Sequence, residues 1–127
     1  MSTAGADRIW IDGALVDVDR ARVSPMDHGL LTGDGVFETL RVYDRRVFAW
    51  DRHLDRLAHS AVALALPLPD RATLRAAADA VVAAATDGNG RLRITVTGGP
   101  GPLGSALDKP TFLPIIAARN PPRAITE

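Results

Sequence analysis

The segment Val36-Phe-Glu-Thr-Leu-Arg-Val-Tyr43 alternates between apolar and polar side chains and predicts a β-strand. Its three aliphatic side chains share one face with Glu38, whereas Phe37 lies on the opposite face. A carboxyl group on an apolar face needs a hydrogen-bond partner or a proton. Glu38 is therefore a candidate functional residue.

The flanking sequence predicts hairpins around this strand. Ile9 to Val16 holds two short apolar runs around Asp12-Gly13, a dipeptide that tolerates the backbone of a tight turn. After Tyr43, the residues Asp44 to Arg46 turn the chain into a second short strand. Two further strands are predicted at residues 92–97 and 111–118.

Two helices are expected between the second hairpin and residue 92. The first begins at Asp51, a residue type that caps helices, and ends before Pro67. The second begins near Asp70 and stops at Gly88. Residues 17–32 lack periodicity and are expected to form a loop. The order of these elements predicts an α+β domain, an antiparallel sheet with two helices packed on one side.

Composition excludes several classes of function. The 127 residues include 15 basic and 15 acidic side chains and no cysteine. The balanced charge lacks the positive excess that binding to nucleic acid requires. Without cysteine there is no disulfide, thiolate nucleophile or Cys-ligated metal. The apolar runs are too short to span a membrane and the N-terminus lacks a secretory pattern, so we expect a cytoplasmic protein without a membrane partner.

Other chemistries fit the sequence poorly. His53 and His59 are six residues apart and do not share a helix face, so they are a poor metal pair, and no metal site is predicted. The glycine turn before Val36 lacks the spacing of a phosphate-binding loop. No serine lies in a nucleophile elbow. A metal hydrolase would have to use Asp27, His28, Asp34, Glu38, Asp51 and His53.

Two further features keep a structural alternative open. Arg52 and Arg56, with Asp51 and Asp55, suit simple ion pairs along an exposed helix face. The loop from Gly98 to Gly104 is equally suited to lining a ligand and to joining two strands. Neither feature alone establishes a site.

Three segments, taken in order, resemble the N-terminal part of class IV aminotransferases, the fold-type IV pyridoxal-phosphate enzymes. They are Ile9-Trp-Ile-Asp-Gly13, Asp27-His-Gly-Leu-Leu-Thr-Gly-Asp-Gly-Val-Phe-Glu-Thr-Leu-Arg41, and His53-Leu-Asp-Arg-Leu57 followed by Ser60-Ala61. The resemblance covers about residues 9–118. It implies a small N-terminal domain at 1–119 and an interdomain linker at 120–127.

The resemblance also implies site residues. Arg56 matches the arginine that binds the phosphate of pyridoxal 5'-phosphate, and a guanidinium fork suits that group. Phe37 would line the substrate pocket together with Gly98 and Gly99. Glu38 and His53 would be buried polar neighbours behind this wall.

In this family the catalytic lysine, which forms a Schiff base with the cofactor, lies in a second, C-terminal domain. Lys109 is the only lysine of the chain and does not match that position. No catalytic residue is therefore expected in residues 1–127, which we expect to be inactive alone. A homodimer acting on a small-molecule substrate is implied.

Among the activities of the family, the segment around Phe37 and an uncharged Gly98–Gly104 loop favour 4-amino-4-deoxychorismate lyase, which releases pyruvate and forms 4-aminobenzoate, a folate precursor. D-amino-acid aminotransferases carry an Arg and a His in that loop, which this chain lacks. The alternatives are a class IV transaminase acting on branched-chain or other amino acids and a non-catalytic binding domain.

Overall fold

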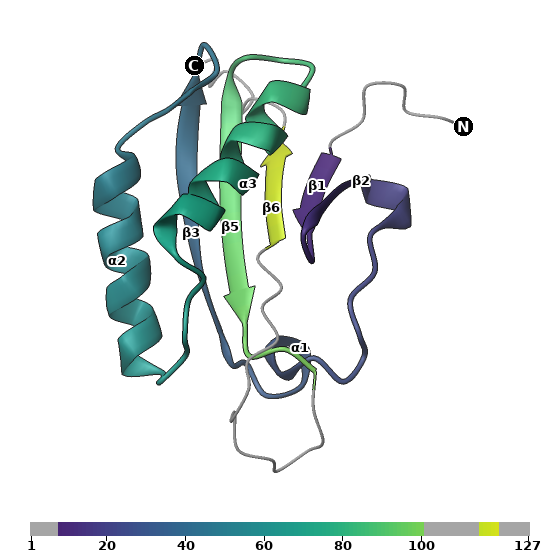
Figure 1. The fold of residues 1–127 in the computed structure, drawn as a ribbon, viewed down its shortest axis with the longest axis vertical. Coiled ribbons are helices and arrows are strands. Elements are labelled where there is room, and N and C mark those ends of the chain that lie inside the picture. Colours follow the sequence, from purple (N-terminus) through teal and green to yellow (C-terminus); the bar gives the residue numbers. More distant parts are fainter. Residues whose placement is uncertain (1–7, 101–114, 120–127) are drawn as a thin grey trace, which may run out of the picture.

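The computed structural model describes residues 8–100 and the backbone of residues 115–119. These residues form an antiparallel sheet with two helices packed on one face (Figure 1). The predicted α+β class is confirmed. The strands are β1 (Arg8–Ile11), β2 (Ala14–Asp17), β3 (Gly35–Tyr43), β4 (Arg46–Val47), β5 (Gly90–Thr97) and β6 (Ile115–Arg119).

The six strands lie in the order β2-β1-β6-β5-β3-β4, and every neighbouring pair is antiparallel. The two predicted hairpins form opposite edges of the sheet. Asp12 and Gly13 take positive φ angles of 51° and 86°, as expected for a tight turn between β1 and β2. Strand β6 joins the β1–β2 hairpin to the rest of the sheet.

The two long helices are α2 (Trp50–Ala63) and α3 (Arg71–Ala84). Figure 1 shows both helices on the same side of the sheet. Helix α2 lies against β3, and α3 contacts β1 and β6. The carboxyl of Asp70 accepts a hydrogen bond from the Thr73 amide at 2.8 Å, which confirms the predicted start of the second helix.

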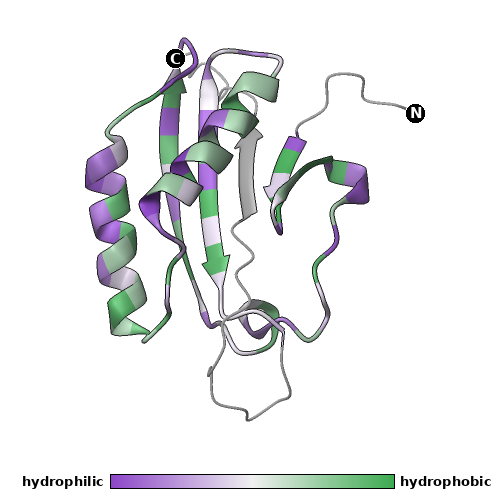
Figure 2. Cartoon of the chain, viewed as in Figure 1, coloured by the Kyte–Doolittle hydropathy of each residue, from purple (hydrophilic) through white to green (hydrophobic). Residues whose placement is uncertain are grey.

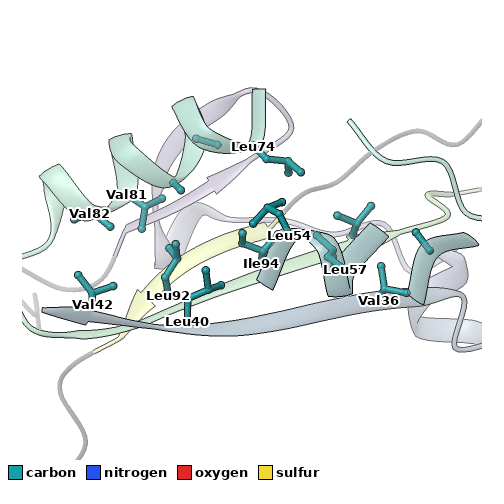
Figure 3. Packing of buried hydrophobic residues seen from close by; sticks show 14 of the residues in the cluster. Val36, Leu40, Val42, Leu54, Leu57, Leu74, Val81, Val82, Leu92 and Ile94 are labelled. Atoms are coloured by element: carbon teal, nitrogen blue, oxygen red, sulfur yellow. The ribbon is translucent and has the colours of Figure 1, made fainter. Parts of the chain in front are cut away.

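The core lies between the helices and the covered face of the sheet. Alternate residues of β3 and β5 are buried, and their hydropathy alternates along each strand in Figure 2. Leu40 and Leu92 are register partners at the centre of this face. Figure 3 shows them packed beneath Leu54 of α2 and Val81 of α3. Each fully buried aliphatic side chain of this kind contributes about 1.5–3 kcal/mol.

Two predicted helix ends were wrong. Helix α2 begins at Trp50, one residue before Asp51, and Ala49 occupies the N-cap in the left-handed conformation without a side-chain hydrogen bond. Helix α3 ends at Ala84 rather than Gly88, because Ala85 is already extended and Arg45 Nη1 donates to the carbonyls of Val82 and Ala85. These ends depend on neighbouring elements, not on local sequence.

The expected loop at residues 17–32 contains two short helices, the 3-10 helix Val18–Arg20 and α1 (His28–Leu31). Asp27 caps α1 through its side chain. The strand predicted at 111–118 is observed as β6, and residues 111–114 lie outside the described residues. In the described part of the chain, no helix is long and apolar enough to cross a membrane.

Candidate functional site

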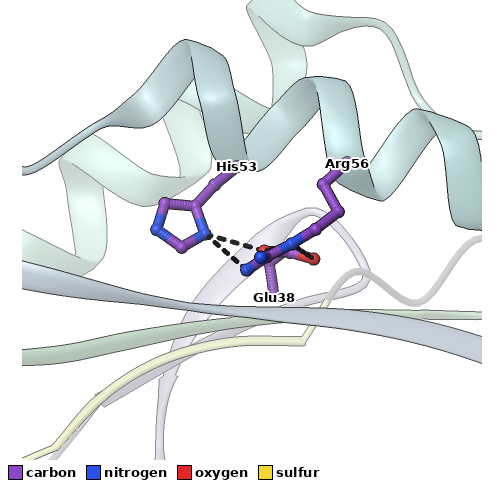
Figure 4. A network of polar contacts seen from close by, with 3 residues as sticks. All are labelled: Glu38, His53 and Arg56. Carbon is purple, nitrogen blue, oxygen red and sulfur yellow. Dashed lines mark hydrogen bonds and ion pairs between the residues drawn. The ribbon is translucent and has the colours of Figure 1, made fainter.

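A buried carboxyl group bound by two side chains of α2 forms the centre of the candidate site (Figure 4). Glu38 is 5% exposed. Arg56 Nε donates to both carboxylate oxygens, at 3.1 and 3.0 Å, and its Nη2 donates to Oε1 at 2.7 Å. Nδ1 of His53 lies 2.7 Å from the same Oε1. Both oxygens of the buried carboxylate are therefore satisfied.

Local structure brings these three residues together. The alternation of β3 turns Glu38 toward the helices, between the buried Val36 and Leu40. His53 and Arg56 are three residues apart on α2, so their side chains lie on neighbouring turns of one face. Burial of Leu54 and Leu57 fixes this helix against the sheet. The network thus joins helix α2 to strand β3.

The charges of Glu38 and Arg56 stabilise each other. Burial of Glu38 acts to raise its pKa, but hydrogen bonds from Arg56 and His53 and their charges outweigh it, so the pKa is lowered. The hydrogen bond to Glu38 and the charge of Glu38 raise the pKa of Arg56. The result is an ionised pair near neutral pH.

Arg56 also reaches solvent. Its side chain is 66% exposed although the partner carboxylate is buried. Glu38 engages Nε and Nη2, and Nη1 has no hydrogen-bond partner among the residues that the structure describes. A guanidinium held on one edge and open on another suits an anion with several acceptor oxygens.

The outer side of α2 beside Arg56 is concave. The concavity has a volume of about 550 Å³. Its only carboxylate, Asp55, is paired with Arg71 at 2.6 Å. The remaining polar groups of the lining are donors or cations, an arrangement that suits an anionic group. The lining residues are Arg52, Asp55, Arg56, His59, Ser60 and Ala63.

The opposite face of β3 carries Phe37, which is 54% exposed. The guanidinium of Arg93 on β5 stacks on this ring, 3.9 Å from its centroid. Arg41 of β3 and Arg91 of β5 are register partners, and Arg91 is two residues from Arg93 along β5. None of these three arginines has an acidic partner within residues 8–100. The face therefore combines an aromatic ring with unneutralised positive charge.

Gly98 and Gly99 are buried where β5 ends. The Gly98 amide donates to the carbonyl of Asp34 at 2.9 Å, and the Gly99 carbonyl accepts from the His28 amide at 2.9 Å. The start of the predicted loop is thus fixed against the segment before β3. Residues 101–104 of the loop, and Lys109, lie outside the described residues.

The residues of the metal-hydrolase alternative are not brought together. In the described part of the chain, no group of three or more His, Asp or Glu side chains could hold a metal ion. Asp27, His28 and Asp34 lie near α1, whereas Glu38 is engaged by His53 and Arg56.

Arg93 and Asp27 are the residues that the sequence interpretation missed. Arg93 alternates with the buried residues of β5, and this pattern predicts that its side chain lies on the exposed face. The pattern does not predict the contact between Arg93 and the ring of Phe37. The only role that the sequence suggests for the Asp27 side chain is that of a ligand in the metal-hydrolase alternative. Asp27 is 1% exposed and binds a backbone amide and a hydroxyl instead.

Comparison with known proteins gives the family. The model of the family "amino-transferase class IV" matches residues 35–127, which include β3, the Glu38 network and α2. The chain belongs to the class IV aminotransferases. It is 41% identical over 121 residues to a putative branched-chain-amino-acid aminotransferase of Methanocaldococcus jannaschii, covering 91% of this chain and 41% of the relative.

Other class IV relatives carry different activities. A D-alanine aminotransferase of Listeria innocua is 36% identical over 93 residues, which cover 72% of this chain and 32% of the relative. The solved 4-amino-4-deoxychorismate lyase of Pseudomonas aeruginosa is 34% identical with a TM-score of 0.69, over 94% of this chain and 41% of that one.

A PLP-bound hypothetical aminotransferase from Mycobacterium tuberculosis superposes with a TM-score of 0.77 at 28% identity, over 92% of this chain and 41% of that one. The chain therefore spans about two fifths of the length of most of these class IV aminotransferases, and its fold matches the small domain that the sequence resemblance implied.

Proposed function

We propose that this chain is the small domain of a pyridoxal-phosphate enzyme and that Arg56 binds the phosphate of the cofactor. The proposal depends mainly on the guanidinium of Arg56. A buried carboxylate anchors it, its side chain is 66% exposed, and its Nη1 has no hydrogen-bond partner among the described residues. The concavity beside it, lined largely by donors, fits a phosphate. The structure neighbour described as PLP-bound supports the choice of cofactor.

Glu38 and His53 act through Arg56 in this proposal. Glu38 fixes Nε and Nη2, so the remaining nitrogen is held in one direction. His53 donates from Nδ1 to the same carboxylate and limits its rotation. Less conformational entropy is then lost when the phosphate binds.

Phe37, Gly98 and Gly99 line the substrate side in this proposal, and Arg93 joins them. Phe37 presents an apolar ring and Arg93 a cation on the same face of the sheet. The buried glycines bring backbone close to this end of the strands. This combination suits a flat, carboxylate-bearing substrate, which the ring would orient and the guanidinium would bind.

Among class IV reactions we propose the lyase, in which 4-amino-4-deoxychorismate loses pyruvate and becomes 4-aminobenzoate. When bound, pyridoxal phosphate supplies an electron sink for the carbon next to the substrate amino group. The lysine that moves the protons is proposed to lie in a second domain. The substrate carries two carboxylates, which matches the unneutralised arginines beside Phe37. Likeness to the Pseudomonas lyase adds support.

A transaminase is the second candidate, because the putative branched-chain-amino-acid aminotransferase of Methanocaldococcus jannaschii is 41% identical to this chain, whereas the Pseudomonas lyase is 34% identical. It would share Arg56 and the lysine and would transfer the amino group to a 2-oxo acid instead. A domain that binds a ligand without catalysis is a third possibility, in which no second domain follows. A homodimer is proposed for either enzyme.

Expression of the open reading frame that contains this chain tests these proposals. The protein would be incubated separately with aminodeoxychorismate and with L-amino acid plus 2-oxoglutarate. Pyruvate and 4-aminobenzoate in the first mixture support the lyase, and glutamate in the second supports the transaminase. A protein that shows no borohydride-sensitive visible absorption after addition of pyridoxal phosphate contradicts both.

A further inference from the structure

Two glycine-containing segments meet at the end of the sheet, away from the Glu38 network. Oδ1 of Asp27 accepts from the Gly29 amide at 2.8 Å, and its Oδ2 accepts from the Thr97 hydroxyl at 3.0 Å. The same hydroxyl oxygen accepts from the Gly99 amide at 3.2 Å. One carboxyl and one hydroxyl thereby connect α1 to the residues that leave β5.

Backbone hydrogen bonds reinforce this connection. The His28 amide donates to the carbonyl of Gly99, and Gly98 donates to Asp34. Residues 27 and 100 also form an isolated antiparallel bridge. The two segments are separated by about 70 residues in sequence, so only the tertiary fold brings them together.

The two segments are packed too closely for a larger side chain. A Cβ atom on Gly29 would lie 2.9 Å from Cβ of Thr97 and still closer to its Cγ2. Real Cβ atoms essentially never approach so closely, so glycine at position 29 permits the contact. The backbone of α1 at Gly29 therefore lies in close contact with Thr97.

Burial makes these hydrogen bonds consequential. Asp27 is 1% exposed and Thr97 is 8% exposed. A buried polar group without a partner is costly, whereas each of these has its partners, and no buried side-chain polar atom among the described residues lacks one. Loss of the Thr97 hydroxyl would leave Oδ2 of Asp27 and the Gly99 amide without their partner.

We propose that Asp27 and Thr97 are a positioning pair that locks Gly98 and Gly99 to helix α1 and so sets the affinity of the enzyme for its substrate. This inference rests on the proposed function, in which Gly98 and Gly99 line the substrate pocket. Neither residue of the pair touches the reacting atoms. The pair holds the backbone at one position, so that no ordering is needed when the substrate binds.

Three variants of the full-length protein test the pair. Thr97→Val keeps the shape of the side chain and removes the hydroxyl, and Thr97→Ser restores a hydroxyl. Val96→Ala is the matched control, since the neighbouring Val96 is fully buried on the helix-covered face and has no hydrogen bond to Asp27. Steady-state kinetics give KM and kcat. The rate of hydrogen exchange at the Gly29 and Gly99 amides measures directly how firmly the two segments are held together.

We expect Thr97→Val to raise KM about tenfold with kcat changed less than about twofold, since one lost buried hydrogen bond has roughly that effect on an equilibrium. Exchange at Gly29 and Gly99 should accelerate by a similar factor. Thr97→Ser should return both values toward those of the wild type. Val96→Ala should lower the Tm without changing KM.

Two results would contradict the proposal that Asp27 and Thr97 position Gly98 and Gly99. The first is unchanged amide exchange in Thr97→Val, and the second is a KM in Val96→Ala as high as in Thr97→Val at equal loss of stability. A wild-type protein inactive on both substrates contradicts the proposed function instead. In that case the exchange measurement alone decides whether the lock exists.

Discussion

Two regions of this domain bury a carboxyl group and use it differently. Glu38 lies on the helix-covered face of β3 and binds the side chains of His53 and Arg56, and the guanidinium of Arg56 reaches solvent. Asp27 lies at the end of the sheet and binds a backbone amide and a hydroxyl. The first carboxyl orients a cation, whereas the second fixes the course of the backbone.

The comparison separates ligand binding from architecture. Around Glu38 the exposed partner, Arg56, is available to an anion, so a change there should affect a ligand as well as stability. Around Asp27 every partner is internal, so a change should act through the positions of neighbouring residues. The outcomes of substitution should therefore differ in kind between the two regions.

The largest effect is expected for Arg56→Ala in the full-length protein. The variant removes the proposed phosphate contact and leaves the buried Glu38 without its bidentate partner. We expect affinity for pyridoxal phosphate to fall about 100-fold, measured by titration of the visible absorption band. Arg75→Ala, on α3 and paired with Asp79 outside the concavity, should change affinity less than about threefold. Equal losses in both variants would contradict the assignment.

Glu38→Gln should destabilise the 127-residue chain by roughly 1–3 kcal/mol in urea denaturation at pH 7, because charge-assisted hydrogen bonds to Arg56 and His53 weaken. The pKa of Glu38 is lowered below its ordinary value of 4.5 in the folded state, where hydrogen bonds from Arg56 and His53 outweigh burial. Its contribution to stability is therefore present above pH 4.5 and is lost as the pH falls through the lower folded pKa.

The pH dependence provides the control for this variant. Stability of Glu38→Gln should fall less steeply with acid than that of the wild type below pH 4.5. Parallel acid unfolding curves for the two proteins would show that the carboxylate is not stabilised by its partners.

Gly29→Ala tests the close packing beside Asp27. The new methyl group would collide with Thr97, and overpacking of this kind costs about 1–3 kcal/mol. Gly88→Ala is the control, since its Cβ would meet Arg45 Cγ at 3.4 Å, an ordinary contact with a flexible side chain. Thermal unfolding should show a lower Tm for the first variant alone. A stable Gly29→Ala protein would mean that the two segments are free to separate.

The smallest effect is expected for Asp55→Asn. Asp55 pairs with Arg71 at 2.6 Å, but their side chains are 71% and 48% exposed. Exposed pairs contribute about 0–1 kcal/mol, so we expect a change below about 0.5 kcal/mol in urea denaturation. A change as large as that of Glu38→Gln would show that burial of the carboxyl is not what distinguishes the two ion pairs.

Much of the fold followed from local patterns. The alternation of β3 placed Glu38 on the covered face, and the spacing of apolar residues in α2 and α3 placed both helices. These predictions hold because an element that packs on one face repeats its apolar residues with the same period along its whole length. The α+β class followed from the order of the elements.

The errors occurred where distant residues determine the backbone. Helix α3 ends where Arg45, about 40 positions earlier in the chain, donates to its last carbonyl groups. Helix α1 has only four residues and depends on the Asp27 cap and on contact with the end of β5. Local propensity carries no information about such partners.

The candidate site was predictable in part for the same reason. The resemblance pointed to Arg56, Glu38 and His53, and the parity of β3 placed Phe37 on the other side of the strand. The stacking of Arg93 on Phe37 depends on the register between β3 and β5, in which Phe37 pairs with Thr95. A single sequence does not specify that register.

The position of β6 has a consequence for biosynthesis. This strand lies between β1 and β5, although it is the last described element of the chain. The hairpin of β1 and β2, made first, has no place in the sheet until residue 119 has left the ribosome. During synthesis the edge of the N-terminal hairpin that pairs with β6 therefore stays unpaired until β6 has been made. This non-local pairing delays completion of the fold.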